Sequence, residues 1–226
     1  MAHLHRFAVP PGLAPEGTVL LSPEESHHAL RVVRLREGDA VALLDGRGRE
    51  YSGRARIAGK REVAVDIETV REELPPAPRL TLAVAALHRE PALESVVRHA
   101  TELGVNRVVF FQAARSERPP RVSDKLERIA FEALKQCGRL WLPELAVRGG
   151  VEEVCAEAAG EQLFLATADL PPLPVRSARL DADATILVGP EGDFTAEERD
   201  VALAAGARPL SLGAAVFRTE VAAMFA

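Results

Sequence analysis

The stretch ATILVGPEGDFTAEERDVALAAG, residues 184–206, decides the fold. It begins with an apolar run, passes through a turn with two glycines and a proline, and ends in a polar run with helical spacing. Thr195 and Glu198 form a T-x-x-E capping box, in which each side chain bonds a backbone N–H at the start of a helix. The stretch therefore predicts a strand, a loop and a helix, and loops of this kind are where α/β proteins bind ligands.

The same alternation of strands and helices continues before this stretch. LTLAVAAL (80–87) and RVVFFQA (107–113) are continuous apolar runs, typical of strands buried on both faces. Residues 91–104 and 123–138 have helical spacing, and each segment ends in a glycine that can stop a helix. Residues 80–226 therefore predict an α/β domain with a mainly parallel sheet.

Residues 1–70 have a different pattern, made of short alternating segments. AVALL and EYSGRARI flank a turn of Asp, Gly, Arg and Gly at 45–48, which predicts a β-hairpin. Ser22 followed by Pro23 and Glu25 predicts the start of a helix. Residues 71–79 carry three prolines and no apolar periodicity, so we expect a linker there between a small β domain and the larger domain.

Composition limits the class of protein. The 226 residues are 47% hydrophobic and 27% charged, as in an ordinary globular protein with a buried core. No apolar stretch approaches the roughly 20 residues that span a bilayer, and the N-terminus lacks the apolar core of a signal peptide. Only Cys137 and Cys155 occur, so we expect no disulfide framework and a cytoplasmic protein. No cluster of carboxylates or cysteines accompanies His27 and His28, so we expect no metal site.

The charge is unevenly distributed along the chain. The formal net charge is −5, which by itself argues against a nucleic-acid partner. Within residues 26–61, however, nine basic side chains stand against four acidic ones. Clustered arginines are typical of a surface that binds phosphate groups. A solvated surface with salt bridges gives the same count, and the sequence leaves that alternative open.

Two glycine-bearing loops can lie side by side at one edge of the expected sheet. Residues 189–192 read Gly-Pro-Glu-Gly, in which the glycines let the backbone approach a ligand and the proline stiffens the turn. Their spacing fits neither the dinucleotide nor the nucleoside-triphosphate motif. In SLGAAVFRTEVAAMFA (211–226) a second glycine loop leads to an Arg-Thr-Glu sequence before an apolar helix. A tight turn and a plain salt bridge are the structural alternatives for the two segments.

The pairing of VGPEGDFTAEE with SLGAAVFRTEVAA resembles the SPOUT, or trefoil-knot, methyltransferases. More closely, the chain is similar over nearly its whole length to the ribosomal RNA small subunit methyltransferase E family. HHALRVVRLREGD followed by LLDGRGREY is similar to the PUA-like RNA-binding barrel of that family. ATELGVNRVVFF, RSER and the E-A-x-x-Q-x-x-R-x-x-x-P pattern at 132–143 are similar to further motifs of the family in the same order.

The resemblance implies a PUA-like β-barrel at 1–70, a linker at 71–79 and a SPOUT-type α/β domain with a trefoil knot at 80–226. It implies transfer of a methyl group from S-adenosyl-L-methionine to N3 of a uridine in 16S ribosomal RNA. The expected partners are this RNA or the 30S subunit, and a second copy of the chain. An RNA-binding relative without activity, and a methyltransferase for another RNA such as a transfer RNA ribose, remain as alternatives.

Individual residues receive candidate roles, partly from the resemblance and partly from their own chemistry. The cofactor-binding candidates are Leu165, Thr167, Gly189, Pro190, Glu191, Gly192, Leu212, Gly213 and Thr219. The catalytic candidates are Glu220, as the base for the N3 proton, and Arg218, which would bind a uracil oxygen or a phosphate. The RNA-binding candidates are Arg31, Arg34, Arg36, Arg47, Arg89, Arg115 and Arg139.

A few positions depart from the family pattern. Asp193 stands where the family usually has glycine, and Ala214, Ala215 and Phe217 replace a proline, an arginine and a leucine of the second loop. The additional carboxylate of Asp193 would repel the carboxylate of the methionine tail or attract its ammonium group, depending on where the side chain points. We expect these departures to affect affinity more than the fold.

Overall fold

The computed structural model of the chain describes residues 4–14, 16–167, 173–174, 179–213 and 215–226. The chain divides into two compact units, the first formed by residues 1–75 with 131–142 and the second by residues 76–130 with 143–226. The sequence places 131–142 in the larger domain, whereas the contacts of this segment group it with the first unit.

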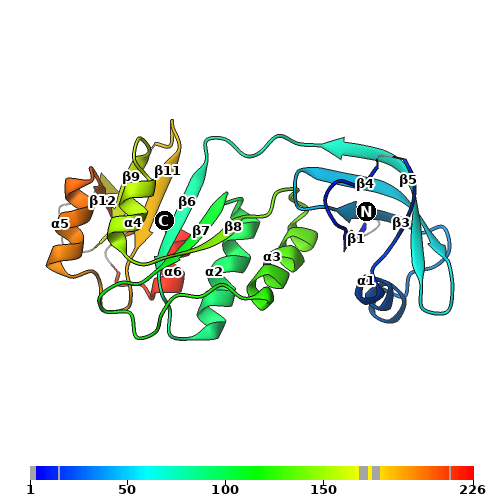
Figure 1. Cartoon of the computed structure of the whole chain (residues 1–226), viewed down its shortest axis with the longest axis horizontal. Helices are drawn as coiled ribbons and strands as arrows, with labels where there is room; N and C mark the ends of the chain where they lie inside the picture. The colour runs from blue at the N-terminus through cyan, green and yellow to red at the C-terminus, as the bar shows by residue number, and fades with distance from the viewer. Residues whose placement is uncertain (1–3, 15, 168–172, 175–178, 214) are drawn as a thin grey trace. The chain divides into compact units, whose positions relative to one another are not determined.

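The first unit is built on a five-stranded mixed sheet with the strand order β1-β3-β4-β5-β2 (Figure 1). Only β1 and β3 pair in parallel; the other pairs of the sheet are antiparallel. β3 and β4 form the expected hairpin, and β5 continues into the segment expected as a linker. The strands are β1 (His5–Ala8), β2 (Gly17–Leu20), β3 (Ala40–Leu44), β4 (Arg49–Ile57) and β5 (Val63–Glu72).

A short helical segment closes the core of the first unit. α1 (Pro23–His27) begins after Ser22, whose hydroxyl accepts a hydrogen bond from the Glu25 N–H at 3.1 Å, as the sequence predicts. It continues directly into a π-helical turn, His28–Val33. The fully buried rings of Phe7 and Tyr51 lie in the core beneath.

The last part of α3 (Asp124–Cys137) is tied to the first unit by a buried charge. The Lys135 side chain is only 9% exposed, and its Nζ lies 2.9 Å from Glu25 Oε1 and 2.7 Å from Glu132 Oε1. Burial alone would lower the pKa of Lys135, but the hydrogen bonds to Glu132 and Glu25 outweigh it and raise the pKa. The two carboxylates therefore keep the buried lysine charged.

The second unit is an α/β structure around a seven-stranded sheet whose pairs are all parallel, in the order β10-β12-β9-β11-β6-β7-β8 (Figure 1). This confirms the predicted parallel sheet. The strands are β6 (Leu80–Ala85), β7 (Arg107–Phe111), β8 (Glu144–Arg148), β9 (Gln162–Ala166), β10 (Leu173–Pro174), β11 (Ala184–Val188) and β12 (Arg208–Ser211). The other helices are α2 (Glu90–Leu103), α4 (Val151–Glu157), α5 (Ala196–Ala204) and α6 (Thr219–Phe225).

Helices cover both faces of this sheet. Phe111 and Leu187 point to one face and share a core with Val154 of α4 and Ala202 of α5. On the opposite face Leu82 meets residues of α2 and α6. Because successive side chains of a strand alternate between faces, a strand covered on both sides must be apolar throughout. This explains the continuous apolar runs in the sequence.

β11 lies in the middle of the sheet, between β9 and β6. The chain adds β7 and β8 on the β6 side, then crosses over to build β9, and later places β12 next to β9. In a parallel sheet all the loops that follow the strands lie at one edge, and ligands bind where the order of strands changes direction. The loops after β9, β11 and β12 are therefore placed to form one site.

Candidate functional site

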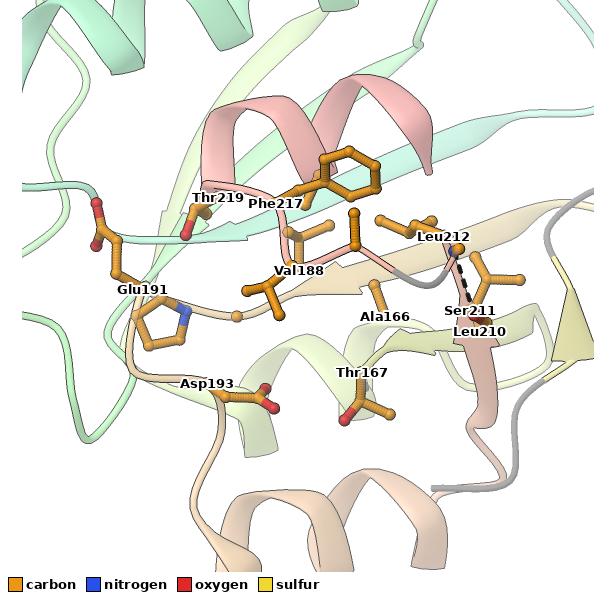
Figure 2. A pocket seen from close by; sticks show the side chains of 16 residues that line it. Ala166, Thr167, Val188, Glu191, Asp193, Leu210, Ser211, Leu212, Phe217 and Thr219 are labelled. Carbon is orange, nitrogen blue, oxygen red and sulfur yellow. Dashed lines mark hydrogen bonds between the residues drawn. The ribbon is translucent and has the colours of Figure 1, made fainter. Parts of the chain in front are cut away.

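An open pocket lies at the carboxyl edge of the seven-stranded sheet, where β9, β11 and β12 end and α6 begins (Figure 2). Its empty space, measured out to the open mouth, is about 640 Å³, which is within the range of small-molecule sites. Three segments form its walls: the end of β9, the loop after β11, and the loop between β12 and α6.

Seven of the nine predicted cofactor residues line this pocket: Thr167, Gly189, Pro190, Glu191, Leu212, Gly213 and Thr219. Leu165 does not, because its fully buried side chain packs in the core of the sheet. The open side of Gly192 is covered by Arg115, whose Cδ would lie 3.1 Å from an added Cβ.

Much of the apolar lining of the pocket was not predicted from the sequence. Val188 and Leu210 line the pocket from the ends of β11 and β12, and Val216 and Phe217 line it from the second loop. Val188 directly precedes Gly189, so tracing the predicted strand to its last residue would have found it. The contribution of Val216, which is 92% exposed, has no comparable signal in the sequence. Ala214 lies outside the described residues.

The loop after β11 is a hydrogen-bonded turn. The Asp193 N–H donates to Pro190 O at 2.9 Å, and Asp193 itself has a φ of 58°. Aspartate is among the few non-glycine residues that tolerate this left-handed conformation, which explains how it replaces a family glycine. A Cβ on Gly189 would lie 3.0 Å from the ring of Phe194, so packing against this ring disfavours a side chain at the first glycine of the loop.

Two side chains fasten this turn to the loop that follows β7. Glu198 is 9% exposed; its Oε2 accepts from the Thr195 N–H at 2.9 Å and its Oε1 from the Ala114 N–H at 2.7 Å. Arg115 Nη1 donates to the carbonyl oxygen of Gly192. The structure confirms the capping box at Thr195. Glu198 of this capping box also holds the loop after β7, a role that the local sequence does not show.

The described residues of the second loop, between β12 and α6, are held by fewer contacts. Gly213 has a φ of 131°, a conformation that favours glycine, and none of the described residues lies within 4 Å of where its Cβ would be. Its N–H donates to Ser211 Oγ at 3.2 Å. Phe217 stacks on Phe225 of α6, with ring centroids 5.1 Å apart and the planes 8° from parallel. The backbone of Gly213 is therefore open to close approach by a ligand.

The polar groups of the pocket carry negative rather than positive charge. Figure 2 shows the Asp193 carboxylate and the Thr167 hydroxyl facing one another across part of the pocket, while Glu191 points away from them. Asp193 Oδ1 also accepts from the Phe194 N–H at 2.7 Å, which fixes its direction. None of the described lining residues is a lysine, arginine or histidine. The pocket therefore suits an apolar or cationic ligand better than a phosphate.

The catalytic candidates lie beside the pocket rather than in its walls. Glu220 is held by Arg89, with Oε1 2.8 Å from Arg89 Nη2, and the glutamate side chain is only 13% exposed. Its Oε2 is buried and has no hydrogen-bond partner among the described residues. Arg218 is exposed and precedes α6 as its N-cap residue. Thr219, between the two, does line the pocket.

The predicted RNA-binding arginines of the first unit are on its surface. Arg31, Arg34, Arg36 and Arg47 are exposed, and none of them has an ion pair among the described residues. Other arginines of the same basic window do pair: Arg49 with Glu72, Arg54 with Glu68 and Arg56 with Asp66. Arg139, also in the first unit, is exposed. The basic window is therefore partly neutralised, and the four unpaired arginines stay available to an anionic partner.

Comparison with known proteins places this geometry in context. Residues 75–226 match a family model described as an RNA methyltransferase domain, and residues 21–68 match one described as an RNA methyltransferase PUA domain. The chain is 31% identical to ribosomal RNA small subunit methyltransferase E from Synechocystis, over 96% of this chain and 74% of the relative. It is 26% identical to the protein of that name from Bacillus subtilis, over 92% of this chain and 88% of the relative.

Solved structures agree along the whole chain. A methyltransferase from Legionella pneumophila, solved with the bound cofactor SAM, superposes with a TM-score of 0.86 at 29% identity. That match covers 99% of this chain and 95% of the other. An rRNA methyltransferase from Porphyromonas gingivalis gives a TM-score of 0.87 at 31% identity, covering 98% and 94%.

Proposed function

The chain belongs to the ribosomal RNA small subunit methyltransferase E family, and we propose that it methylates N3 of a uridine in 16S ribosomal RNA with S-adenosylmethionine. One observation carries the proposal. The segment that matches the RNA methyltransferase domain contains a pocket with apolar walls and an aimed carboxylate, and none of its described lining residues is basic. A cationic cofactor with a neutral adenine ring fits this combination, whereas a phosphorylated cofactor does not.

The residues of the pocket also fit the cofactor in detail. Gly213 leaves its backbone uncovered, so the flat face of a base can approach it closely. Val188, Leu210 and Leu212 supply an apolar surface that excludes water. Asp193 would accept a hydrogen bond from the ammonium group of the methionine tail. When bound, S-adenosylmethionine supplies a methyl group activated by a positively charged sulfur.

The chain's own contribution to the reaction is to position the uridine and to remove its N3 proton. Glu220 is the base in this proposal, because it is a largely buried carboxylate next to pocket residue Thr219. Arg89 binds one oxygen of Glu220 and leaves Oε2 to accept the proton. Arg218, exposed at the start of α6, would contact the uracil oxygen or a flanking phosphate.

RNA affinity in this proposal comes mainly from charge. Arg31, Arg34, Arg36 and Arg47 of the first unit are exposed and unpaired among the described residues, and contacts of this kind weaken steeply with salt. The chain is 4% aromatic, so stacking platforms for unpaired bases are few. Arg115 and Arg139 are further RNA candidates, although Arg115 already holds the loop at Gly192.

The proposal is tested by methylation of 16S rRNA, naked and in 30S subunits, from cells that lack the modification. We expect one labelled 3-methyluridine, mapped by mass spectrometry after incubation with methyl-labelled S-adenosylmethionine. Label on a ribose or in transfer RNA would instead support a methyltransferase for another RNA. Tight cofactor binding without any transfer would support the non-catalytic alternative.

Substitution of the catalytic candidates tests their roles. Glu220→Gln should lower kcat about 10²–10⁴-fold, as expected for loss of a general base. Arg218→Ala should abolish turnover with a smaller effect on cofactor binding. Arg98→Ala is a matched control, because Arg98 is exposed on α2 and has no partner among the described residues. If cofactor affinity falls in step with turnover in Arg218→Ala, its assignment to the RNA is wrong.

We also propose that two copies of the chain form a homodimer. Val216, Phe225 and Leu103 are 92%, 56% and 60% exposed, and they come from the second pocket loop, α6 and α2. α6 contacts α2, and Phe225 of α6 stacks on Phe217 of the loop. Exposed apolar groups of this kind are typical of protein interfaces. Sedimentation equilibrium should give twice the mass of the 24.3 kDa chain. Val216→Asp should shift that equilibrium toward the monomer.

Three smaller expectations also belong to the proposal. None of the described helices is both long and apolar enough to cross a membrane, and we propose a cytoplasmic location, where ribosomal RNA is found. We propose the domains at 1–70 and 80–226 with a linker at 71–79. The trefoil knot is a further prediction from the family resemblance.

A further inference from the structure

A second hollow opens at the same edge of the seven-stranded sheet, between the end of β6 and the loop that follows β7. Its empty space, measured out to its mouth, is about 570 Å³. Leu87 and Leu93 form a floor that is 4% and 6% exposed, and Pro119 and Pro120 form an apolar side. His88, Arg118 and Arg121 stand at the rim. The hollow combines an apolar floor with cationic groups, the reverse of the charge in the cofactor pocket.

We propose that this hollow binds one nucleotide of the RNA substrate, with its base on the apolar floor and its phosphate at Arg118 and Arg121. The inference rests on the proposed function, because it takes the substrate to be RNA. A nucleotide presents a flat, uncharged base and a dianionic or monoanionic phosphate, and the two parts match the floor and the rim. Unpaired RNA bases are typically splayed out into pockets of this kind.

The charges around the rim favour an anion beside Arg118 and Arg121. Arg118 is exposed and has no ion-pair partner among the described residues. Arg121 lies 3.6 Å from Glu90, and both side chains are about half exposed, so this pair is weak and easily exchanged. His88 pairs with Glu117 at 3.0 Å. The two arginines are therefore the groups that a phosphate would meet, and a bidentate guanidinium suits it.

The hollow adjoins the cofactor pocket through paired strands. β6 and β11 are neighbours, with Val84 opposite Val188, so the residues that follow the two strands lie next to each other at the sheet edge. Arg89, one residue after His88, pairs with Glu220, one residue after Thr219 of the cofactor pocket. A nucleotide in the hollow would therefore lie on the side of the reacting centre where Glu220 is placed.

The loop after β7 contacts both sites. Its first part bonds the cofactor loop through Ala114 to Glu198 and through Arg115 to Gly192. Its later part supplies Arg118, Pro119, Pro120 and Arg121 to the hollow. One short loop thus contributes to both the cofactor pocket and the hollow. The hollow is therefore close enough to the cofactor pocket to take part in substrate binding.

The inference is tested first by direct binding, without catalysis. The full chain with ¹³C-labelled leucine methyl groups is titrated with uridine 5′-monophosphate, uridine and inorganic phosphate, and followed by NMR. We expect the monophosphate to shift the methyl groups of Leu87 and Leu93 at millimolar concentration, with uridine and phosphate each binding at least fivefold more weakly. The methyl groups of Leu210 and Leu212 report entry into the cofactor pocket.

Arg118→Ala should weaken this binding about tenfold, and Arg118→Lys should recover part of the loss. Shifts confined to Leu210 and Leu212 would overturn the inference. So would phosphate binding as tightly as the nucleotide, or unchanged affinity in Arg118→Ala. Arg118 is exposed, so circular dichroism should show the variants folded.

Kinetics give the second test. Arg118→Ala should raise KM for the RNA about tenfold and lower the slope of affinity against salt by about one phosphate contact, with affinity for S-adenosylmethionine unchanged. Arg98→Ala should change none of the three. Binding of the nucleotide by a chain that methylates nothing would sink the proposed function alone. Methylation with normal KM in Arg118→Ala, and no shift at Leu87 or Leu93, would sink this inference alone.

Discussion

The two loops that wall the cofactor pocket are held in very different ways. The loop at 189–193 is fixed by its own turn, by Arg115 on Gly192, and by the fully buried ring of Phe194. The loop at 212–218 bonds Ser211 through Gly213, and its Val216 side chain is almost fully exposed. One wall of the pocket is therefore preformed, whereas the described residues of the other make few contacts of their own.

This difference divides the work of binding between the two walls. A preformed wall costs no ordering entropy when the ligand arrives, so it can supply position and charge. A wall with few buried contacts has low local stability and can adjust to the ligand and to the RNA. Changes that disturb the packing of the first loop should therefore act mainly on folding, and changes in the second loop mainly on binding.

The largest effect on the free energy of unfolding is expected at Phe194, whose buried ring holds the first loop. Phe194 is fully buried and stacks on Phe111, with ring centroids 6.3 Å apart and planes 5° from parallel. Phe194→Ala should lower the free energy of unfolding by about 3–5 kcal/mol, the usual cost of such a cavity. Phe225→Ala, which removes a 56% exposed ring packed on the second loop, is the matched control and should cost about 1 kcal/mol. Urea unfolding measures both variants. Equal losses of unfolding free energy would contradict the difference between the two loops.

The next effect is at the bond between the first loop and the loop after β7. Glu198→Ala removes the glutamate half of the capping box and leaves the N–H groups of Thr195 and Ala114 without their partner, which should cost about 2 kcal/mol and weaken cofactor binding. Glu197→Ala is the control. Hydrogen bonds from its own backbone N–H and from the Thr195 hydroxyl lower the pKa of Glu197, so this exposed carboxylate is ionised at neutral pH. If urea unfolding shows that Glu197→Ala lowers the free energy of unfolding as much as Glu198→Ala does, then negative charge at the start of α5, and not the bond to Ala114, stabilises this region.

Features that depend on neighbouring residues could be predicted from the sequence, whereas features with a weak local pattern could not. The buried strands β6 and β7, the capping box at Thr195 and the glycine that ends α2 were all predicted, because each depends on a few neighbouring residues. β8 was not predicted: none of its residues is fully buried, and it follows the segment predicted as a helix at 123–138. Local periodicity is a weak signal for a half-exposed edge strand.

The candidate site shows the same limit. The glycine loops could be recognised because their residues are contiguous, and seven of the nine predicted cofactor residues line one pocket. The bond from Glu198 to Ala114 spans 84 positions, and the pair of Arg89 and Glu220 spans 131. Such contacts depend on the order of strands in the sheet, which local patterns do not specify. The apolar walls were missed for the same reason.

A smaller effect is expected at the glycine of the second loop. Gly213→Ala places a side chain on a backbone with a φ of 131°, so the loop must move, although open space surrounds it. Because this loop has few contacts, we expect little loss of stability but about a tenfold loss of affinity for S-adenosylmethionine. Gly189→Ala should do the opposite and mainly destabilise, since its Cβ would press on the ring of Phe194. Calorimetry with urea unfolding separates them, and the same response in both would contradict the division of roles.

The smallest effect, and the most specific, concerns the charge on the preformed wall. Asp193→Asn keeps the left-handed backbone and the hydrogen bond from the Phe194 N–H, so only the negative charge is lost. If Asp193 attracts the ammonium group of the methionine tail, the Kd for S-adenosylmethionine should rise about threefold to fivefold, less so in high salt. The Kd for 5′-methylthioadenosine, which lacks that tail, should not change. Glu191→Gln is the matched control, because this second carboxylate points away from Asp193 and Thr167 (Figure 2). Tighter binding by Asp193→Asn would mean that Asp193 repels the tail carboxylate, and the fixed wall would then oppose the cofactor at this point instead of orienting it.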